Sequence, residues 1–452
     1  MDEIFTSLIM GEIHNEDILI KDISENSILF ISQKELNETE SIILRLYNLE
    51  ESSYEQFTLV NCKIYKMCID NTYYTFKADI ISPCERLKVA LCNIKEFSKQ
   101  RNYHISRVDY SKLDFLKNKK PIYPTAQDKN IYDFKNVSKE WFEFTIDYNT
   151  NEKYKKIAKQ KEIAFALNTD YLMQKCRDSS YKDIYYATLK KYHLENHGLL
   201  EAGNQRVYIG NEFCQNLLPC NHILEYINKA NDEDYEVTVM LSVMDESMVK
   251  RIICVIDEIE QYCVINQKKI EIIVNDWGVL NYIKSNTSMI VPVLGRLLNK
   301  RIKDPRRRWT WHDKNDESLR SNCLSNNDYF RKFVNEYGVE RFEFEVYENK
   351  EDVKSLILKG NMNSLHFPFY QMMTSLYCPL FYEYNNFVQN RLMIHNCPHI
   401  CKEIVRTYSR DLRMIGIGNS NFVYVKDILT DPDILEIYCN NGIDRLVFSP
   451  II

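Results

Sequence analysis

Short apolar runs separated by polar turns make up the first hundred residues. Five of these runs are rich in β-branched and aromatic side chains, which favour strands: residues 18–20, 27–31, 41–47, 57–67 and 73–81. Residues 85–100 then carry apolar side chains at helical spacing, from Leu87 to Phe97. The pattern predicts a small all-β barrel closed by a helix over residues 1–100.

The pattern weakens over residues 101–204. Residues 101–135 are polar and contain Pro121 and Pro124, which indicates a linker. Further along, apolar positions such as Ile163 and Leu167 repeat at helical spacing. We therefore expect a linker followed by a helical bridge.

From residue 205 the pattern changes to strands and helices in alternation. Apolar runs predict strands at residues 205–209, 236–243, 269–275, 290–294, 341–347, 364–369 and 444–448. Helical periodicity lies between several of them, as in residues 246–263. This alternation, over 205–452, predicts an α/β TIM-like (β/α)8 barrel whose chemistry lies on the loops after the strands.

Composition narrows the class of protein. The chain has 452 residues, 45% of them hydrophobic and 27% charged, which is typical of a globular protein. Its formal charge of -6 predicts no general attraction to nucleic acid or anionic membranes. No apolar stretch approaches the roughly 18 residues that span a bilayer, and the acidic start is unlike a signal peptide. We expect a cytoplasmic protein without membrane insertion.

Fourteen cysteines in such a chain are better explained as thiols or metal ligands than as disulfides. Cys214 follows the first predicted strand of the barrel, at its catalytic rim. Cys378, Cys397 and Cys401 follow the strand at 364–369 in a turn-rich segment, the last two as C-x-x-x-C. Four thiolates suit either a tetrahedral zinc ion or an iron–sulfur cluster, and the spacing does not decide between them.

Asn275 and Asp276 end the third predicted strand of this barrel and are the candidate catalytic residues. Asp276 could accept a substrate proton or simply cap the helix that begins beside it. Arg296 follows the strand at 290–294, so its guanidinium could bind a carboxylate or phosphate at the barrel mouth.

Three further residues complete the predicted substrate-binding set, and they come directly after Arg296: Asn299, Lys300 and Arg301. The basic run continues to Arg308, and Trp309 and Trp311 could stack on bases, so a nucleic-acid contact stays open. A peptidase is less favoured, because the chain contains neither H-E-x-x-H nor G-x-S-x-G.

The sequence IKDISENSILFIS at residues 20–32 resembles the PilZ family, in which a D-x-S-x-x-G turn and an R-x-x-x-R arm bind cyclic di-GMP. Asp22 and Ser24 match the turn, but Ser27 replaces its glycine and no arginine arm precedes it. The resemblance implies a degenerate PilZ-like domain that lacks the guanidinium clamp for the nucleotide.

The barrel region resembles the collagenase-like peptidase (U32-type) family, most closely its O2-independent hydroxylase branch. The resemblance rests on YIGNEFC, IEIIVNDWGVLNYI, VLGRLLNKRIKDPR, FEFEVY and the later cysteines. It implies a TIM-like barrel that holds one 4Fe-4S cluster through Cys214, Cys378, Cys397 and Cys401. It also implies a small carboxylate oxygen donor, prephenate in members of the branch, and a second subunit of the same family. The alternative class is a non-catalytic interaction or scaffold protein with a structural metal site.

Overall fold

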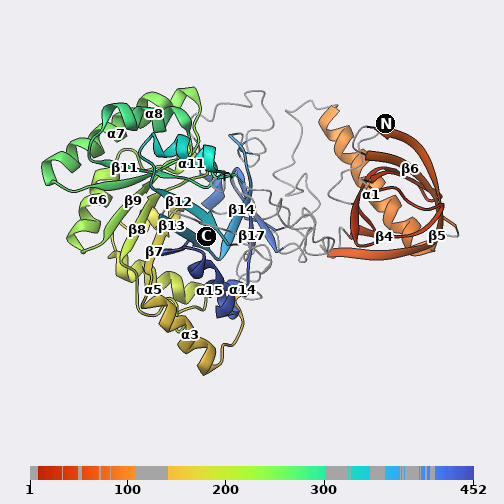
Figure 1. Ribbon diagram of the computed structural model, residues 1–452, viewed down its shortest axis with the longest axis horizontal. Coiled ribbons are helices and arrows are strands. Elements are labelled where there is room, and N and C mark those ends of the chain that lie inside the picture. Colours follow the sequence, from red (N-terminus) through yellow and green to blue (C-terminus); the bar gives the residue numbers. More distant parts are fainter. Residues whose placement is uncertain are drawn as a thin grey trace.

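The computed structural model describes residues 9–32, 34–48, 53–70, 73–81, 83–106, 141–300, 324, 327–346, 362–376, 378, 381, 397, 399–402, 405–407 and 413–451. Figure 1 shows two β-barrels, an N-terminal one in red and orange and a second one in yellow to blue. No helix in these ranges is long and apolar enough to cross a membrane.

The N-terminal barrel is closed and antiparallel, with the strand order β1-β2-β3-β6-β5-β4. Its elements are β1 (Ile9–Ile13), β2 (Glu16–Ile23), β3 (Ser27–Ser32), β4 (Thr39–Asn48), β5 (Ser53–Asp70), β6 (Tyr73–Asp79) and the helix α1 (Glu85–Ser106). Buried and partly exposed residues alternate along β3, as in a strand with one face on the core. Leu87, Leu91 and Ile94 of α1 join the barrel core, so the predicted barrel with its closing helix is confirmed.

The second barrel is closed by eight parallel strands in chain order, which confirms the TIM-like fold. The strands are β7 (Glu162–Leu167), β8 (Arg206–Gly210), β9 (Glu236–Met240), β10 (Ile270–Val274), β11 (Ile290–Leu294), β12 (Arg341–Glu345), β13 (Met362–Phe367) and β18 (Arg445–Phe448). The helices described around them are α3 (Tyr148–Ala158), α4 (Asp170–Lys175), α5 (Tyr181–Lys191), α6 (Ile223–Asp232), α7 (Glu246–Asn266), α8 (Trp277–Asn286), α11 (Asp328–Asn335), α14 (Asp427–Thr430) and α15 (Pro432–Asn440).

The first strand, β7, corrects the prediction of a helical bridge that ends at residue 204. It pairs in parallel with β18 on one side and β8 on the other. A strand buried on both faces is apolar at every position, so the spacing of Ile163 and Leu167 imitated a helical repeat. Ala164 and Ala166 instead pack inside the barrel, while Ile163 and Leu167 join the larger core outside it. Residues 162–204 therefore belong to the barrel.

A four-stranded antiparallel sheet is inserted between β13 and β18. It consists of β14 (Phe369–Thr374), β15 (Arg406–Thr407), β16 (Met414–Ile417) and β17 (Ser420–Tyr424), in the order β14-β17-β16-β15. Cys378, Cys397 and Cys401 come between β14 and β15, with Cys401 in the short turn η5 (Ile400–Lys402). Because β7 precedes β8, Cys214 follows the second strand of the barrel and not the first. We call the four-stranded sheet of β14, β15, β16 and β17 the insertion sheet.

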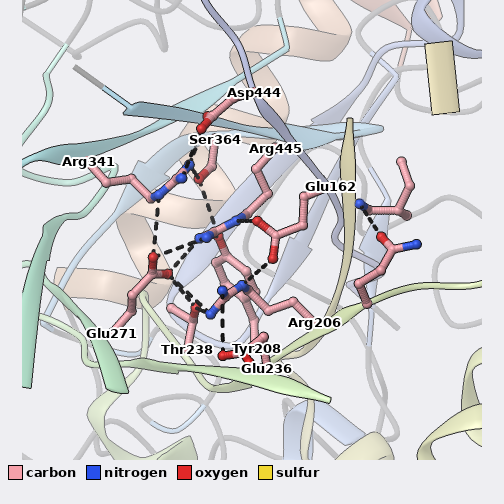
Figure 2. Close-up of polar contacts among 12 residues, drawn as sticks. Glu162, Arg206, Tyr208, Glu236, Thr238, Glu271, Arg341, Ser364, Asp444 and Arg445 are labelled. Carbon is pink, nitrogen blue, oxygen red and sulfur yellow. Dashed lines mark hydrogen bonds and ion pairs between the residues drawn. The ribbon is translucent and has the colours of Figure 1, made fainter. Parts of the chain in front are cut away.

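A ring of ion pairs closes the barrel at the amino ends of its strands (Figure 2). We call it the basal ring, and its members are Glu162, Arg206, Glu271, Arg341, Asp444 and Arg445. Arg445 is 2% exposed, and it donates to Glu162 Oε2 and to Glu271 Oε2, both at 2.6 Å. Arg206 donates to the other oxygen of Glu162 at 2.6 Å, so one carboxylate bridges β7, β8 and β18.

The charges in the basal ring are matched closely enough to keep a buried carboxylate ionised. Burial alone would raise the pKa of Glu271, but the hydrogen bond and charge of Arg445, with the charges of Arg206 and Arg341, lower it to about 2. A carboxylate with a lowered pKa stabilises the fold above its unfolded pKa. That stabilisation is lost as the pH falls towards the folded value.

We expect Glu271→Gln to lower the free energy of unfolding by about 3–5 kcal/mol at pH 7, because it leaves buried guanidinium groups without their partner. The difference from the wild type should narrow as the pH falls from about 4.5 towards 2, since protonation then weakens the wild-type ring as well. Urea denaturation of both proteins at several pH values measures this difference in the free energy of unfolding. The matched control is Glu225→Gln, whose side chain is 69% exposed and should change stability by less than about 1 kcal/mol. A difference in the free energy of unfolding that does not change with pH would contradict the assignment of an ionised Glu271 in the basal ring.

Candidate functional site

The loop that carries Cys214 is shaped by the last residue of β8 and the residue after it. Gly210 has a φ of 116°, and a Cβ there would lie 2.5 Å from the Met240 carbonyl oxygen, so only glycine fits. The Asn211 side chain accepts from the backbone N–H groups of Phe213 at 2.8 Å and Cys214 at 2.7 Å. These bonds turn the chain back over the carboxyl end of the barrel and hold Cys214 at the rim.

The four predicted cysteine ligands lie within electrostatic reach of one another. Burial raises the pKa of the Cys214 thiol, and the charges of Cys378, Cys401 and Cys397 raise it further. Burial likewise raises the pKa of Cys401 to about 12, again with contributions from Cys378 and Cys397. The rim loop after β8 and the chain between β14 and β15 thus bring the four sulfurs into one neighbourhood.

Four thiols are, by their chemistry, the donor set of a soft metal site. As these residues are arranged, no three His, Cys, Asp or Glu side chains in the described ranges form a group that could hold a single metal ion. The histidine of the C-x-x-x-C turn is otherwise engaged, since His399 Nδ1 lies 3.4 Å from Asp170 Oδ1. Lys402 also pairs with Asp170, which ties the turn to the start of α4.

Arg296, the predicted anion anchor, is paired with the protein's own carboxylates. Its guanidinium donates to Glu212 Oε1 from Nε at 2.9 Å and lies 2.7 Å from the same oxygen through Nη2. Nη1 lies 3.4 Å from Glu345 Oε1. Arg296 is 5% exposed and its guanidinium lies 4.7 Å from the centre of the Phe213 ring. The expectation of a guanidinium open to a substrate anion is therefore corrected.

Asn275, a predicted catalytic residue, connects three segments of the rim. It is 2% exposed, and its Nδ2 donates to the Leu241 carbonyl at 2.9 Å and to Glu212 Oε2 at 3.3 Å. Its Oδ1 accepts from the Leu297 N–H at 2.9 Å. With both ends of the amide engaged, its observed role is to hold Glu212 and the loop after β11 in place.

Asp276 takes the capping role that the sequence left open. One of its carboxylate oxygens accepts from the backbone N–H groups of Gly278 at 2.8 Å and Val279 at 3.2 Å, at the start of α8. A carboxylate used in this way needs no catalytic explanation.

Of the three remaining predicted substrate-binding residues, Asn299 and Lys300 lie within the described ranges. Asn299 is buried and donates to the backbone carbonyl of Glu343 at 3.3 Å. Lys300 is exposed. Arg301 lies outside the described residues, together with the rest of the basic run up to Arg308.

A buried histidine and glutamate lie beneath the rim. His366 is fully buried, with Nε2 2.7 Å from Glu343 Oε2 and Nδ1 2.7 Å from the Ser449 hydroxyl. Tyr208 donates to the other Glu343 oxygen at 3.2 Å. The sequence signal for these two residues was a titratable side chain within an apolar run, His366 in LHFPF and Glu343 in FEFEVY. We call Glu212, Arg296, Glu343, Glu345 and His366 the rim cluster.

The His366–Glu343 pair is held neutral by its surroundings. Burial raises the pKa of Glu343 to about 7, although Arg445 and Arg341 oppose the shift. Burial and the charge of Arg296 lower the pKa of His366 to about 3. Below pH 7 the pair therefore shares one proton and carries no net charge.

A cavity of about 340 Å³ lies beside the cysteines, between the loops after β7 and β8 and the insertion sheet. Cys214 and Cys401 are both in its wall, together with Asn168, Phe213 and Phe422. A second cavity of about 320 Å³ is lined by Cys397, His399 and residues 215–222. Three of the four cysteines thus border space that a small molecule could occupy.

We predict that the free energy of unfolding falls by on the order of 3 kcal/mol as the pH rises from about 4.5 to 7, through Glu343 alone. The folded protein keeps this proton while the unfolded chain releases it, so stability falls as the pH rises. Glu343→Gln should remove this part of the slope, as measured by chemical denaturation across the range. Glu225→Gln again serves as the exposed control. An unchanged slope in Glu343→Gln would show that Glu343 is ionised in the folded protein.

No family model and no curated protein matches this chain. Solved structures to which it is similar include the U32 peptidase Mk0906, at 9% identity and a TM-score of 0.31, over 64% of this chain and 92% of that one. The uncharacterized Legionella protein Lpg0364 matches at 16% identity and a TM-score of 0.16, over 21% of this chain and 90% of that one. Plasmodium falciparum HPPK-DHPS matches at 11% identity and a TM-score of 0.29, over 87% of this chain and 66% of that one.

Proposed function

We propose that this chain is an iron–sulfur protein that acts as an O2-independent hydroxylase or as a subunit of one. The 4Fe-4S cluster would be held by Cys214, Cys378, Cys397 and Cys401. The observation that carries the proposal is that Cys214 and Cys401, from rim segments far apart in the sequence, line one cavity, with Cys397 in the wall of a second cavity beside residues 215–222. The carboxyl end of a TIM-like barrel is where such folds carry their chemistry.

The neighbouring residues suit a sulfur-only site. Asp170, the carboxylate nearest to the C-x-x-x-C turn, is engaged by His399 and Lys402. Glu212, two residues before Cys214, is bound by Arg296 and Asn275. With the nearby oxygen ligands occupied, thiolates are the ligands that remain, and thiolates favour iron–sulfur clusters or zinc.

Bound at this site, a cluster would supply electron transfer or an iron atom that accepts a ligand. The chain's own residues would provide a dry, fixed surrounding for it. In the rim cluster, Glu212 and Glu345 share the buried guanidinium of Arg296, and the His366–Glu343 pair holds one proton below the rim. The cavity beside Cys214 and Cys401 would hold a small molecule next to the metal.

The hydroxylase reaction comes from the resemblance to the O2-independent branch, and within it to the UbiV subunit of anaerobic ubiquinone synthesis. That resemblance implies oxygen transfer from a small carboxylate donor and a second subunit of the same family. Because Arg296 is paired with Glu212 and Glu345, a carboxylate donor would need another positive group. Lys300 and the basic run after it are the candidates.

The pairing of Arg296 also favours a second candidate function, a scaffold protein in which the metal site is structural. A rim whose Arg296 guanidinium is neutralised by Glu212 and Glu345 has less to offer an anionic substrate. Binding of prephenate to the cluster-loaded protein, measured by calorimetry, separates the two candidates. Saturable binding favours the hydroxylase, and its absence favours the scaffold.

Anaerobic purification followed by iron and sulfide analysis tests the metal assignment. We expect about four iron and four sulfide per chain in the wild type. Cys214→Ser should lose most of both, because one corner of the cluster has no thiolate. Cys254→Ser, an exposed cysteine on α7, is the matched control and should keep the full content. Stoichiometric zinc without sulfide would identify the alternative metal, and neither metal would refute the proposal.

We further propose that the N-terminal barrel is a PilZ-like domain that has lost its nucleotide site. Its turn between β2 and β3 is closed internally, since Ser24 Oγ accepts from the Ser27 N–H at 3.0 Å and lies 3.0 Å from the Ser27 hydroxyl. Calorimetric titration with cyclic di-GMP should give no binding tighter than about 10 µM, or roughly 7 kcal/mol. Tighter binding would mean that other residues replace the missing arginines.

A further inference from the structure

The cavity beside Cys214 and Cys401 is lined by apolar side chains in one part and by polar ones in another. The apolar part comes from the loop after β8, the insertion sheet and the chain after β18: Phe213, Leu217, Ile417, Phe422 and Ile451. Polar and charged side chains come mainly from the loop after β7 and from α4 and α5: Thr169, Asp170, Gln174 and Lys191. The volume of about 340 Å³ is within the range of small-molecule sites. A ligand that fits both parts has an apolar body and a polar group.

The charged side chains of this wall leave one positive charge in excess. Among the described residues that line the cavity, they are Asp170, Lys191 and Lys402. Lys402 pairs with Asp170, which also accepts from Gln174 at 3.1 Å. Lys191 pairs with no carboxylate of the described residues. The rim cluster lies behind Phe213 and contributes no residue to the wall. A singly charged anion would therefore balance the cavity.

Lys191 lies at the cavity, held against another of its wall residues. It is the last residue of α5, and its Nζ lies 5.1 Å from the centre of the Tyr171 ring, which also lines the cavity. Although the side chain keeps exposed surface, desolvation lowers the pKa of its ammonium group, so protein surrounds much of it. An ammonium group that has lost part of its hydration gains more from a paired anion than a fully solvated one does.

We propose that this cavity binds a small aromatic monocarboxylate, whose carboxylate pairs with Lys191 and whose ring packs against Phe213 and Phe422. The two phenylalanine rings, with centres 5.1 Å apart, provide aromatic surface for the body of the ligand. One carboxylate matches the one excess charge, whereas a phosphate monoester carries about −1.5 to −2 at pH 7. A dianion such as prephenate would leave a charge unmatched. The ligand is therefore a different compound from the donor of the proposed function.

Binding of the monocarboxylate follows from the cavity alone. Because Cys214 and Cys401 line the same cavity, the bound molecule would lie beside the metal site. The further step, that this molecule is the substrate, rests on the proposed function.

The test compares three probes with the same aromatic body: cinnamate, its neutral amide, and benzylidenemalonate, which carries a second carboxylate. Their affinities are measured by ligand-observed NMR on the full chain purified without oxygen. Wild-type protein should bind cinnamate about tenfold more tightly than cinnamamide, because only the carboxylate pairs with the ammonium group. Benzylidenemalonate should bind no more tightly than cinnamate. In Lys191→Met the ratio of the cinnamate and cinnamamide affinities should fall to about one.

Three further variants control for charge, folding and location. Lys190→Met is the matched control, since Lys190 also lies in the last turn of α5 but does not line the cavity, and it should keep the wild-type ratio. Lys191→Arg retains the positive charge and should keep most of the preference, which guards against a misfolded Lys191→Met. Ile417→Trp adds volume to the wall and should weaken the binding of all three probes.

Equal binding of cinnamate and its amide by wild type, binding of neither, tighter binding of the dianion, or a preference that persists in Lys191→Met would overturn the proposal. Iron and sulfide analysis of the same samples keeps the two hypotheses apart. Selective cinnamate binding without iron would leave the cavity's ligand standing and remove the proposed function, and a full cluster without selectivity would do the reverse.

Discussion

The ion pair between Arg445 and Glu162 is the contact on which the second barrel depends. Arg445 begins the last barrel strand and Glu162 begins the first, so their hydrogen bond of 2.6 Å joins the two ends of the barrel sequence. Glu162 also accepts from Arg206 of the next strand. A parallel barrel needs its final strand to find the first across the whole intervening chain, and this buried pair specifies that seam.

The two ends of the barrel differ in role, and the basal ring lies at the end that stabilises closure. At the amino ends of the strands, matched charges stabilise closure and leave no cavity among those described. Above them, an apolar layer from β7, β8, β9, β10, β11 and β18 fills one side of the interior. The other side, built by β12 and β13, carries Glu343, Ser364 and His366. Polar groups thus extend from the base to the rim along one wall only.

The buried polar contacts on this side of the barrel explain why the charged part of the rim is rigid. Glu212 from the loop after β8 and Glu345 from the end of β12 hold Arg296, and Asn275 fixes Glu212 from the loop after β10. Each contact is buried, so separating any pair would leave a charge in a medium of low dielectric constant. The cysteines and the cavity adjoin this framework, since Phe213, which lies between Glu212 and Cys214, lines the cavity and contacts Arg296. The rim therefore combines a fixed electrostatic framework with an adjacent space for ligands.

Much of this architecture could be predicted from local pattern. Seven of the eight parallel strands, the N-terminal barrel and the rim position of Cys214 follow from periodicity and from the rule that loops after parallel strands share one end of the barrel. The strand β7 was missed because its continuous apolar run fits a buried helix as well as a buried strand. The insertion sheet was missed because its strands lie within a segment whose cysteines suggested a loop.

The sequence by itself determined which residues can ligate, titrate and pack, because those properties belong to single side chains. Only the tertiary structure decided their partners. Arg296 has the same guanidinium whether it binds a substrate or a protein carboxylate, and the choice was made by Glu212 and Glu345, which approach from other segments of the barrel. His366 and Glu343 are ordinary titratable residues until burial shifts both pKa values. Pairing and desolvation depend on distances between segments remote in the chain, and no local pattern encodes those distances.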